Sequence, residues 1–322
     1  MGDSNRIILS TLAGVIINRL PKSLLSPGIK TVLILFFASL LAGCHTGHKL
    51  SRLIPSGASL EKLADGFSFT EGPAADADGN VYFTDQPNDR ILKWSTEGQL
   101  SVFLQPSGRS NGMYFDPEGY LWTCADENNS FWRINPDKSY TVIVPEYTGN
   151  SLNGPNDLWI RPDGGIYFTD PYYQRPWWSH TTMPQECQGV YFFNPLDGKV
   201  LRVISDLVKP NGIVGSADGK RLYVADIGGN KTWRYTIKPD GSLSDKTHFC
   251  SLGSDGMTID SSGNLYLTGK GVTIFNRRGR LVGNIPVPEN WTANVCFGDA
   301  DRKGLYITAS KGLYRIRLER GQ

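Results

Sequence analysis

The chain has 322 residues, of which 39% are hydrophobic and 20% charged, with 36 glycines and 19 prolines. This composition is too apolar for a disordered chain and too rich in Gly and Pro for a coiled coil. The net charge is +2, but residues 1–43 contribute +3 through four basic side chains against one Asp, so the remainder stands at −1. A near-neutral body without a basic run argues against a nucleic-acid partner.

The first 43 residues are typical of a lipoprotein-type signal peptide. A basic stretch ending at Lys30 precedes thirteen mostly apolar residues, 31–43, too few to span a bilayer. Residues 41–44 (Leu-Ala-Gly-Cys) resemble the bacterial lipobox, in which the cysteine, here Cys44, is lipidated; an ordinary signal peptide is the alternative. We expect residues 44–55 to form a tether and the protein to be exported and lipid-anchored to the cell envelope. His45 after the cysteine favours the outer membrane, facing the periplasm.

Residues 56–322 repeat one pattern six times, a Gly-containing turn followed by an apolar strand with one aromatic residue. The aromatic residues are Tyr82, Trp122, Tyr167, Tyr223, Tyr266 and Tyr306, separated by 40 to 56 residues. A period near 40–45 with alternating strands predicts four-stranded blades. The expected fold class is therefore all-β, a six-bladed β-propeller, and residues 60–63 could supply the strand that closes the ring. Lone thiols are expected for most of Cys124, Cys187, Cys250 and Cys296, which show no C-x-x-C spacing.

A second register places one carboxylate or amide in every repeat, 11 or 12 residues before the aromatic residue. These residues are Glu71, Asn111, Asn156, Asn211, Asp255 and Asn294. The innermost strand of a blade lines the channel, so the six side chains would converge at one mouth of the ring. Two carboxylates and four amides form an oxygen-only site that suits Ca²⁺, with Zn²⁺ or Mn²⁺ as alternatives. Each Asx residue alone could simply cap a turn.

An insertion at 171–188 interrupts the third repeat. Strand parity brings it out at the same mouth as the ring of polar residues, where a long aromatic loop is expected to act as a substrate lid or wall. An oligomer contact or structural flap is the alternative. The candidate substrate contacts in it are Tyr172, Tyr173, Arg175, Trp177, Trp178 and His180.

Several of these motifs resemble the gluconolactonase/senescence-marker-protein (regucalcin-like) family. They are Thr70-Glu71-Gly72-Pro73, Ser110-Asn111-Gly112-Met113, Gly154-Pro155-Asn156-Asp157, Pro210-Asn211-Gly212-Ile213 and Ser254-Asp255-Gly256-Met257, and residues 167–173 look like the bacterial exported gluconolactonase branch. The resemblance implies a propeller with a divalent ion, usually Ca²⁺, in its channel. It also implies that Glu71, Asn211 and Asp255 are metal ligands, that Asn156 is a fourth ligand or a substrate contact, and that Asp255 is the acid/base residue. Animal members carry Arg two residues before the position of Asn156, where this chain has Gly154, so their sugar specificity is not carried over.

These features predict a metal-dependent lactonase that hydrolyses a gluconolactone-like sugar lactone to its aldonic acid. The metal would polarise the carbonyl and Asp255 would move the proton, although direct attack by Asp255 is left open. The expected substrate contacts are Asn111, Asn156, Asp157, Asn294, Tyr172, Arg175, Trp177 and Trp178. The alternatives are phosphotriesterase or aryl esterase activity at the same site, or a non-catalytic ligand-binding lipoprotein with structural Ca²⁺.

Overall fold

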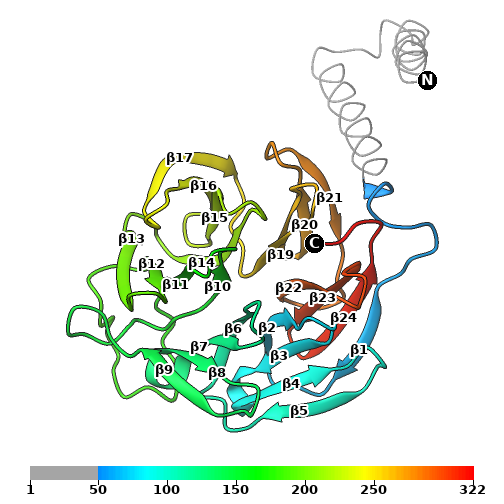
Figure 1. Cartoon of the computed structure of the whole chain (residues 1–322). Helices are drawn as coiled ribbons and strands as arrows, with labels where there is room; N and C mark the ends of the chain where they lie inside the picture. The colour runs from blue at the N-terminus through cyan, green and yellow to red at the C-terminus, as the bar shows by residue number, and fades with distance from the viewer. Residues whose placement is uncertain (1–49) are drawn as a thin grey trace, which may run out of the picture. The chain divides into compact units, whose positions relative to one another are not determined.

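The computed structural model describes residues 50–322, so the predicted signal peptide and Cys44 lie outside the described residues. Six four-stranded antiparallel sheets form the ring of blades seen in Figure 1. The first three blades comprise β2 (Thr70–Ala75), β3 (Val81–Asp85), β4 (Arg90–Trp94) and β5 (Leu100–Leu104); β6 (Ser110–Phe115), β7 (Leu121–Ala125), β8 (Ser130–Ile134) and β9 (Tyr140–Val144); and β10 (Leu158–Ile160), β11 (Ile166–Asp170), β12 (Gly189–Asn194) and β13 (Lys199–Ile204).

The other three blades follow the same plan. They comprise β14 (Pro210–Gly215), β15 (Arg221–Asp226), β16 (Lys231–Ile237) and β17 (Leu243–Cys250); β18 (Met257–Ile259), β19 (Leu265–Gly269), β20 (Gly271–Phe275) and β21 (Leu281–Ile285); and β22 (Thr292–Gly298), β23 (Gly304–Ala309), β24 (Gly312–Arg317) and β1 (Glu61–Asp65). The prediction of a six-bladed, all-β propeller is thus confirmed.

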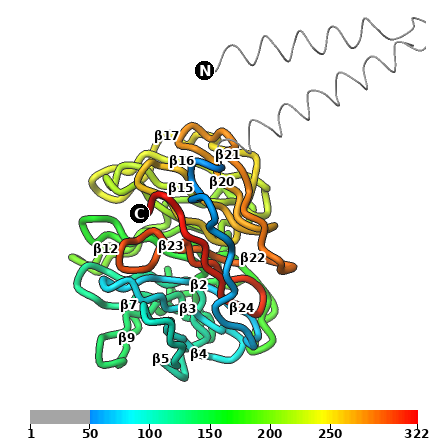
Figure 2. The backbone as a smooth tube through the Cα atoms, turned by 90° about the vertical axis from the view of Figure 1, so that its right-hand side faces the viewer, coloured from blue at the N-terminus to red at the C-terminus, as the bar shows by residue number. Residues whose placement is uncertain are grey.

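The ring closes where the N-terminal strand β1 pairs with β24, with Glu61 opposite Arg315 and Asp65 opposite Gly312. Figure 2 shows this blue strand running beside the red C-terminal strands. β1 thereby covers the edge of β24 and gives the sixth blade its fourth, outermost strand. Residues 50–54 do not behave as the expected tether, because Leu53 is only 8% exposed and packs with the core of the last two blades. Residues Lys49–Gln322 form one compact unit.

The repeated aromatic residues are buried because they fill the space between neighbouring blades. Tyr82 packs against Phe115 of the next blade with ring centroids 4.9 Å apart, and Tyr266 packs against Phe297 at 5.4 Å. Such side chains bury about 150–250 Å² each and account for much of the core energy. Tight turns hold the strands in register; Gly119, for example, has φ +88° in the turn that begins at Asp116. The four cysteines in the described part of the chain are free, and no helix in that part is long and apolar enough to span a membrane.

Candidate active site

Five of the six polar residues in the repeated register line one cavity of about 340 Å³ at the mouth of the channel: Glu71, Asn111, Asn156, Asn211 and Asp255. In each of the five blades that carry them, the aromatic residue pairs with a residue of the inner strand, and the polar residue lies three positions before that partner. In the first blade, for example, Tyr82 pairs with Ala74, and Glu71 lies three positions before Ala74. The common register therefore directs the same position of five blades towards the axis.

The sixth blade differs from the prediction. Its aromatic residue, Tyr306, pairs with Cys296, so the position equivalent to Glu71 is Ala293 rather than Asn294. The hairpin between β22 and β23 is longer than that of the first blade, and a count of twelve residues lands one position too far along the strand. The predicted ring of six polar side chains is thus a ring of five.

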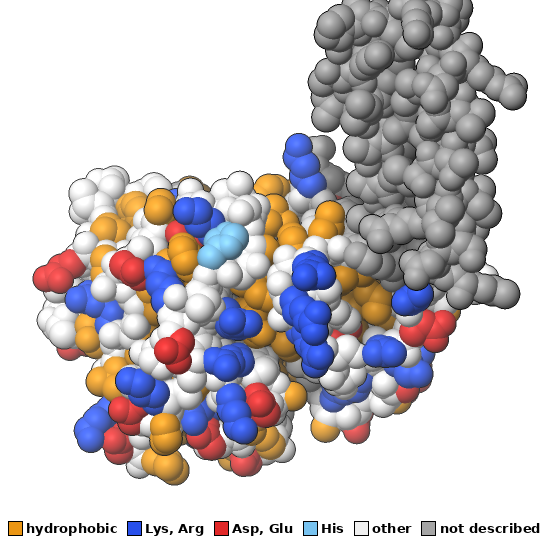
Figure 3. All heavy atoms as spheres, turned by 90° about the horizontal axis from the view of Figure 1, so that it is seen from above, with side chains coloured by type: hydrophobic (Ala, Val, Ile, Leu, Met, Phe, Trp, Pro, Cys, Tyr) orange, Lys and Arg blue, Asp and Glu red, His pale blue; other side chains and the backbone are white. Residues whose placement is uncertain are grey.

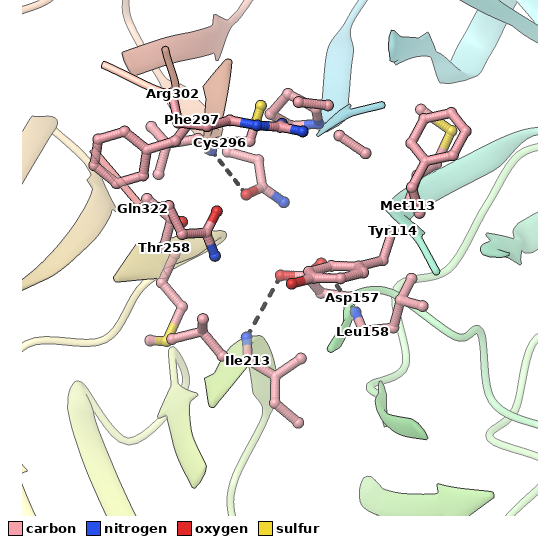
Figure 4. Close-up of a pocket in the computed structure, with 18 residues that line it drawn as sticks. Met113, Tyr114, Asp157, Leu158, Ile213, Thr258, Cys296, Phe297, Arg302 and Gln322 are labelled. Atoms are coloured by element: carbon pink, nitrogen blue, oxygen red, sulfur yellow. Dashed lines mark hydrogen bonds between the residues drawn. The ribbon is translucent and has the colours of Figure 1, made fainter. Parts of the chain in front are cut away.

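Asn294 and Asp157 occupy the next position along the inner strand, where the other four blades carry Gly72, Gly112, Gly212 and Gly256. Asp157 and Asn294 do not line the mouth cavity; they line a second cavity of about 310 Å³ further along the channel, in which Figure 4 shows Asp157 beside Ile213. The glycines make room for them, because a Cβ on Gly112 would lie 2.7 Å from Asp157 Oδ1 and one on Gly256 would lie 1.9 Å from Asn294 Cγ.

The two carboxylates of the mouth cavity, Glu71 buried and Asp255 half-buried, are close enough to repel each other. Glu71 is 3% exposed and its Oε2 accepts a hydrogen bond from the Gly72 amide at 2.8 Å. Burial, together with the charge of Asp255, raises the pKa of Glu71 well above its ordinary value. Burial also raises the pKa of Asp255 to about 6, against the opposing hydrogen bonds from Trp291 and Asn211. The site therefore has a deficit of positive charge.

The amides of the ring present unpartnered oxygens. The Nδ2 group of Asn211 donates to Asp255 Oδ1 at 2.7 Å and to the Tyr173 hydroxyl at 3.0 Å. Within residues 50–322, Oδ1 of Asn211 and Oδ1 of Asn111 are buried and accept no hydrogen bond. Such atoms are costly unless a ligand satisfies them. No group of three or more His, Cys, Asp or Glu side chains in the described residues could hold a metal, so a cation here would depend on amide oxygens as well as the two carboxylates.

The insertion contributes Tyr173 and Arg175 to the cavity. Arg175 Nε donates to the buried Asp126 at 2.8 Å, and Gln86, in the short 3₁₀ helix η2 (Gln86–Asn88), donates to the same Oδ2 at 2.9 Å. The indole of Trp178 donates to the main-chain oxygen of Asp126 at 2.7 Å. These contacts join the insertion to the start of η3 (Asp126–Asn128) in the second blade, so it forms a fixed wall of the site.

Four other predicted contacts in the insertion do not line the cavity. Trp178 is 9% exposed and packs between Tyr172, at 5.9 Å, and His180, at 4.9 Å between ring centroids. Trp177 lies under the guanidinium of Arg109, 4.4 Å from the ring centroid. Tyr172, Trp177, Trp178 and His180 therefore support the wall instead of forming its inner surface.

Sequence reasoning missed four residues that line the cavity: Phe69, Gln86, Ile227 and Trp291. Trp291 bears directly on the chemistry, since its Nε1 donates to Asp255 Oδ2 at 2.6 Å. Phe69 and Trp291 each stand two residues before the ring position of their blade. A search of that position in every repeat could have found both.

Comparison with known proteins gives a consistent result. The model of the SMP-30/gluconolactonase/LRE-like region matches residues 69–311. A gluconolactonase from Zymomonas mobilis is 29% identical over 302 residues, which cover 84% of each chain. The structure of a gluconolactonase from Xanthomonas campestris superposes with a TM-score of 0.78 at 30% identity, covering 84% of this chain and 92% of that one. A regucalcin from Agrobacterium tumefaciens, described as calcium-binding, has a TM-score of 0.69 at 18% identity, with 82% and 95% covered, a likeness of fold alone.

Proposed function

The chain belongs to the SMP-30/gluconolactonase/LRE-like family and is a hydrolase of cyclic esters, and from this premise we propose that its substrate is a small sugar lactone, gluconolactone or a close analogue. The product would be the aldonic acid, and the reaction would need a divalent cation, Ca²⁺ by preference. The observation that carries the proposal is the convergence of two carboxylates and three amides, two of them with unpartnered buried oxygens, on one cavity. The experiment at the end of this section distinguishes lactone hydrolysis from phosphotriesterase or aryl esterase activity and from a non-catalytic binding role.

The residues present fit a hard cation. Glu71 and Asp255 supply the negative charge, and the free Oδ1 of Asn211 together with Asn156 would complete an oxygen-only set. The raised pKa values of both carboxyls have the same main origin, since burial disfavours their charged forms, and the charge of Arg175 opposes this only in part at Asp255. A bound divalent cation would polarise the lactone carbonyl and stabilise the oxyanion that forms when water adds.

Asp255 is well placed to move the proton. Its two oxygens accept hydrogen bonds from different groups, Oδ1 from Asn211 and Oδ2 from Trp291, so the plane of the carboxylate is fixed. In the proposed reaction, Asp255 takes one proton from the attacking water as the new C–O bond forms. It then returns that proton to the ring oxygen as the ester C–O bond breaks and the ring opens.

The walls suit a polyhydroxylated substrate. Arg175 uses only its Nε on Asp126, and its two Nη groups make no hydrogen bond within residues 50–322. These Nη groups can donate hydrogen bonds to the hydroxyls of a sugar, and Asn111 Oδ1 can accept hydrogen bonds from such hydroxyls. The indole of Trp291, 37% exposed, and the ring of Phe69 add apolar surface for the carbon skeleton.

The experiment is acid release from a panel of aldonolactones, an aryl ester and an organophosphate, by protein before and after chelation. We expect lactone turnover that chelation removes and Ca²⁺ restores, with D255N inactive. D240N is the matched control, because Asp240 is an exposed carboxylate in a turn between β16 and β17. Full activity in D255N would refute the role of Asp255. Turnover of only the aryl ester or the organophosphate would change the substrate class, and no turnover of any substrate would favour a binding protein.

A further inference from the structure

The turn between β20 and β21 differs in charge from the same turn in the other blades. In each of the first five blades the turn between the third and fourth strands is closed by a main-chain N–H that donates back to the first residue of the turn. In blades one to four, the residue just before this donor is acidic: Glu97, Asp137, Asp197 and Asp240. In the fifth blade it is Arg278, flanked by Arg277 and Arg280. Residues 261–288 contain four basic side chains and no acidic one.

The arginines have no structural task in the turn. In three of the other blades the acid stabilises its own turn; Asp240 Oδ1, for example, accepts the amide of Ser242 at 3.0 Å. In the fifth blade, Asn276 Oδ1 performs this function by accepting the amides of Arg278 and Arg280, at 2.9 and 3.1 Å. The side chains of Arg277, Arg278 and Arg280 are exposed and form no hydrogen bond or ion pair within the described residues.

The same rim of the propeller receives the N-terminal end of the described chain. The side chain of Leu50 lies over Gly283, in the middle of β21, with its atoms 3.0–3.2 Å from the place of a Cβ. Arg280 is three residues from Gly283, about 10 Å along the strand. Between them lies Leu281, which is 45% exposed. Figure 3 shows Lys and Arg side chains gathered on the face seen from above, on the side where Figure 1 places β17 and β21.

We propose that the turn of Arg277, Arg278 and Arg280, with Leu281, contacts the anionic lipid headgroups of the membrane to which the sequence predicts the protein is anchored. Cys44 and Leu50 are six positions apart in the sequence, and an extended chain of that length reaches at most about 20 Å. A lipid on Cys44 would therefore limit how far Leu50, and with it the arginine turn, can lie from the membrane surface. Basic side chains beside an exposed apolar one are suited to an anionic interface, where each Lys or Arg strengthens binding about fivefold.

This contact would orient the enzyme. The turn lies at the rim of a blade, whereas the candidate active site opens on the axis of the ring. With the rim of the fifth blade against the membrane, the mouth lined by Glu71 and Asp255 would stay open to small molecules in solution. The inference concerns the placement of the protein and does not depend on which substrate it hydrolyses.

The test uses residues 49–322, which form a compact unit with a closed ring, in sedimentation with vesicles of phosphatidylcholine containing about one third phosphatidylglycerol or none. We expect weak binding to the anionic vesicles alone, lost when salt shortens the Debye length to a few Å. The triple variant R277Q/R278Q/R280Q should lose binding on the order of 100-fold. The control K138Q/K199Q/K238Q removes the same charge from exposed positions at the equivalent turns of the second, third and fourth blades and should bind within about twofold of the wild type.

Several results would overturn the proposal. Equal losses in the two triple variants would mean that net charge, and not this turn, governs binding. Binding to neutral vesicles, or none to the anionic ones at high lipid concentration, would also refute it. Binding to a soluble polyanion but not to vesicles would assign the turn to another partner. Circular dichroism and thermal unfolding of both variants separate these outcomes from misfolding.

Discussion

The packing of Asn294 against Gly256 predicts that the effect of Gly256→Ala on stability depends on the residue at position 294. The position of Cβ on Gly256 lies 1.9 Å from both Cγ and Oδ1 of Asn294, and Gly256 does not have a positive φ. The cost of Gly256→Ala is therefore steric and not conformational. Overpacking of this kind costs about 1–3 kcal/mol of unfolding free energy.

Truncation of Asn294 removes the atoms that would clash. Asn294→Ala alone should cost about 1–3 kcal/mol, because the buried amide of Val295 loses its acceptor, Oδ1 at 2.8 Å. In that background Gly256→Ala should become neutral or stabilising by up to about 1 kcal/mol, since Ala restricts the unfolded chain more than Gly does. The expected coupling energy is thus about 1–4 kcal/mol, well above the 0.5 kcal/mol or so seen for independent sites.

Equilibrium unfolding by guanidinium, with chelator present, measures all four proteins of this double-mutant cycle. Gly212→Ala is the matched control, because its Cβ would meet backbone atoms, Asp255 O at 2.8 Å and Gly256 C at 3.1 Å. Its cost should be the same with Asn294 or Ala at position 294. If Gly256→Ala cost as much in the Asn294→Ala background as in the wild type, the placement of Asn294 inside the channel would be wrong.

Three further predictions concern the site and its supports. Trp291→Phe keeps the ring but removes the N–H that fixes Asp255, so kcat should fall about tenfold with little change in KM, as steady-state kinetics would reveal; an unchanged kcat would contradict it. Arg175→Met should raise KM more than it lowers kcat, because hydroxyl donors are lost while Asp255 keeps its hydrogen bonds from Asn211 and Trp291, and an unchanged KM would exclude Arg175 from binding. Burial raises the pKa of Asp170 to about 7, so the folded state holds this proton at a pH where the unfolded chain, with pKa near 3.9, has released it. Asp170 thus makes the free energy of unfolding fall as pH rises from about 4 to 7. The free energy of unfolding of the wild type, relative to that of Asp170→Asn, should fall by at least about 1 kcal/mol between pH 5 and 8. If the two proteins showed the same dependence on pH, the raised pKa of Asp170 would be refuted.

The sequence predicts the propeller and most of the polar ring because both depend on one register that repeats in every blade. Glu71, Asn111, Asn156 and Asp255 lie the same distance before their aromatic residues, and Asn211 is offset by one in a hairpin that is one residue longer. Counting back from the aromatic residue fails at Asn294, because the count does not show that the hairpin between β22 and β23 is longer than the others. Only the strand pairing reveals it.

The inner surface of the insertion could not be predicted for a different reason. The segment has no regular period, and its orientation depends on Asp126, a residue of another blade. A buried carboxylate that accepts from Arg175 and Gln86 decides which side chains face the cavity. The sequence places the aromatic residues near the site but does not distinguish Tyr173, which reaches it, from Trp178, which supports it.

The position two residues before the ring is the part of the mouth that varies most from blade to blade. In the six blades this position holds Phe69, Arg109, Gly154, Lys209, Gly253 and Trp291. Phe69 and Trp291 line the cavity directly, whereas the amino group of Lys209 lies over Tyr173 at 4.3 Å. At Gly154 a Cβ would lie 2.7 Å from Trp178, so the insertion fills the space that a larger side chain would need. In this blade the mouth is therefore shaped by the inserted wall, which supplies Arg175 from another direction, while the ring position that carries Asn156 is unchanged.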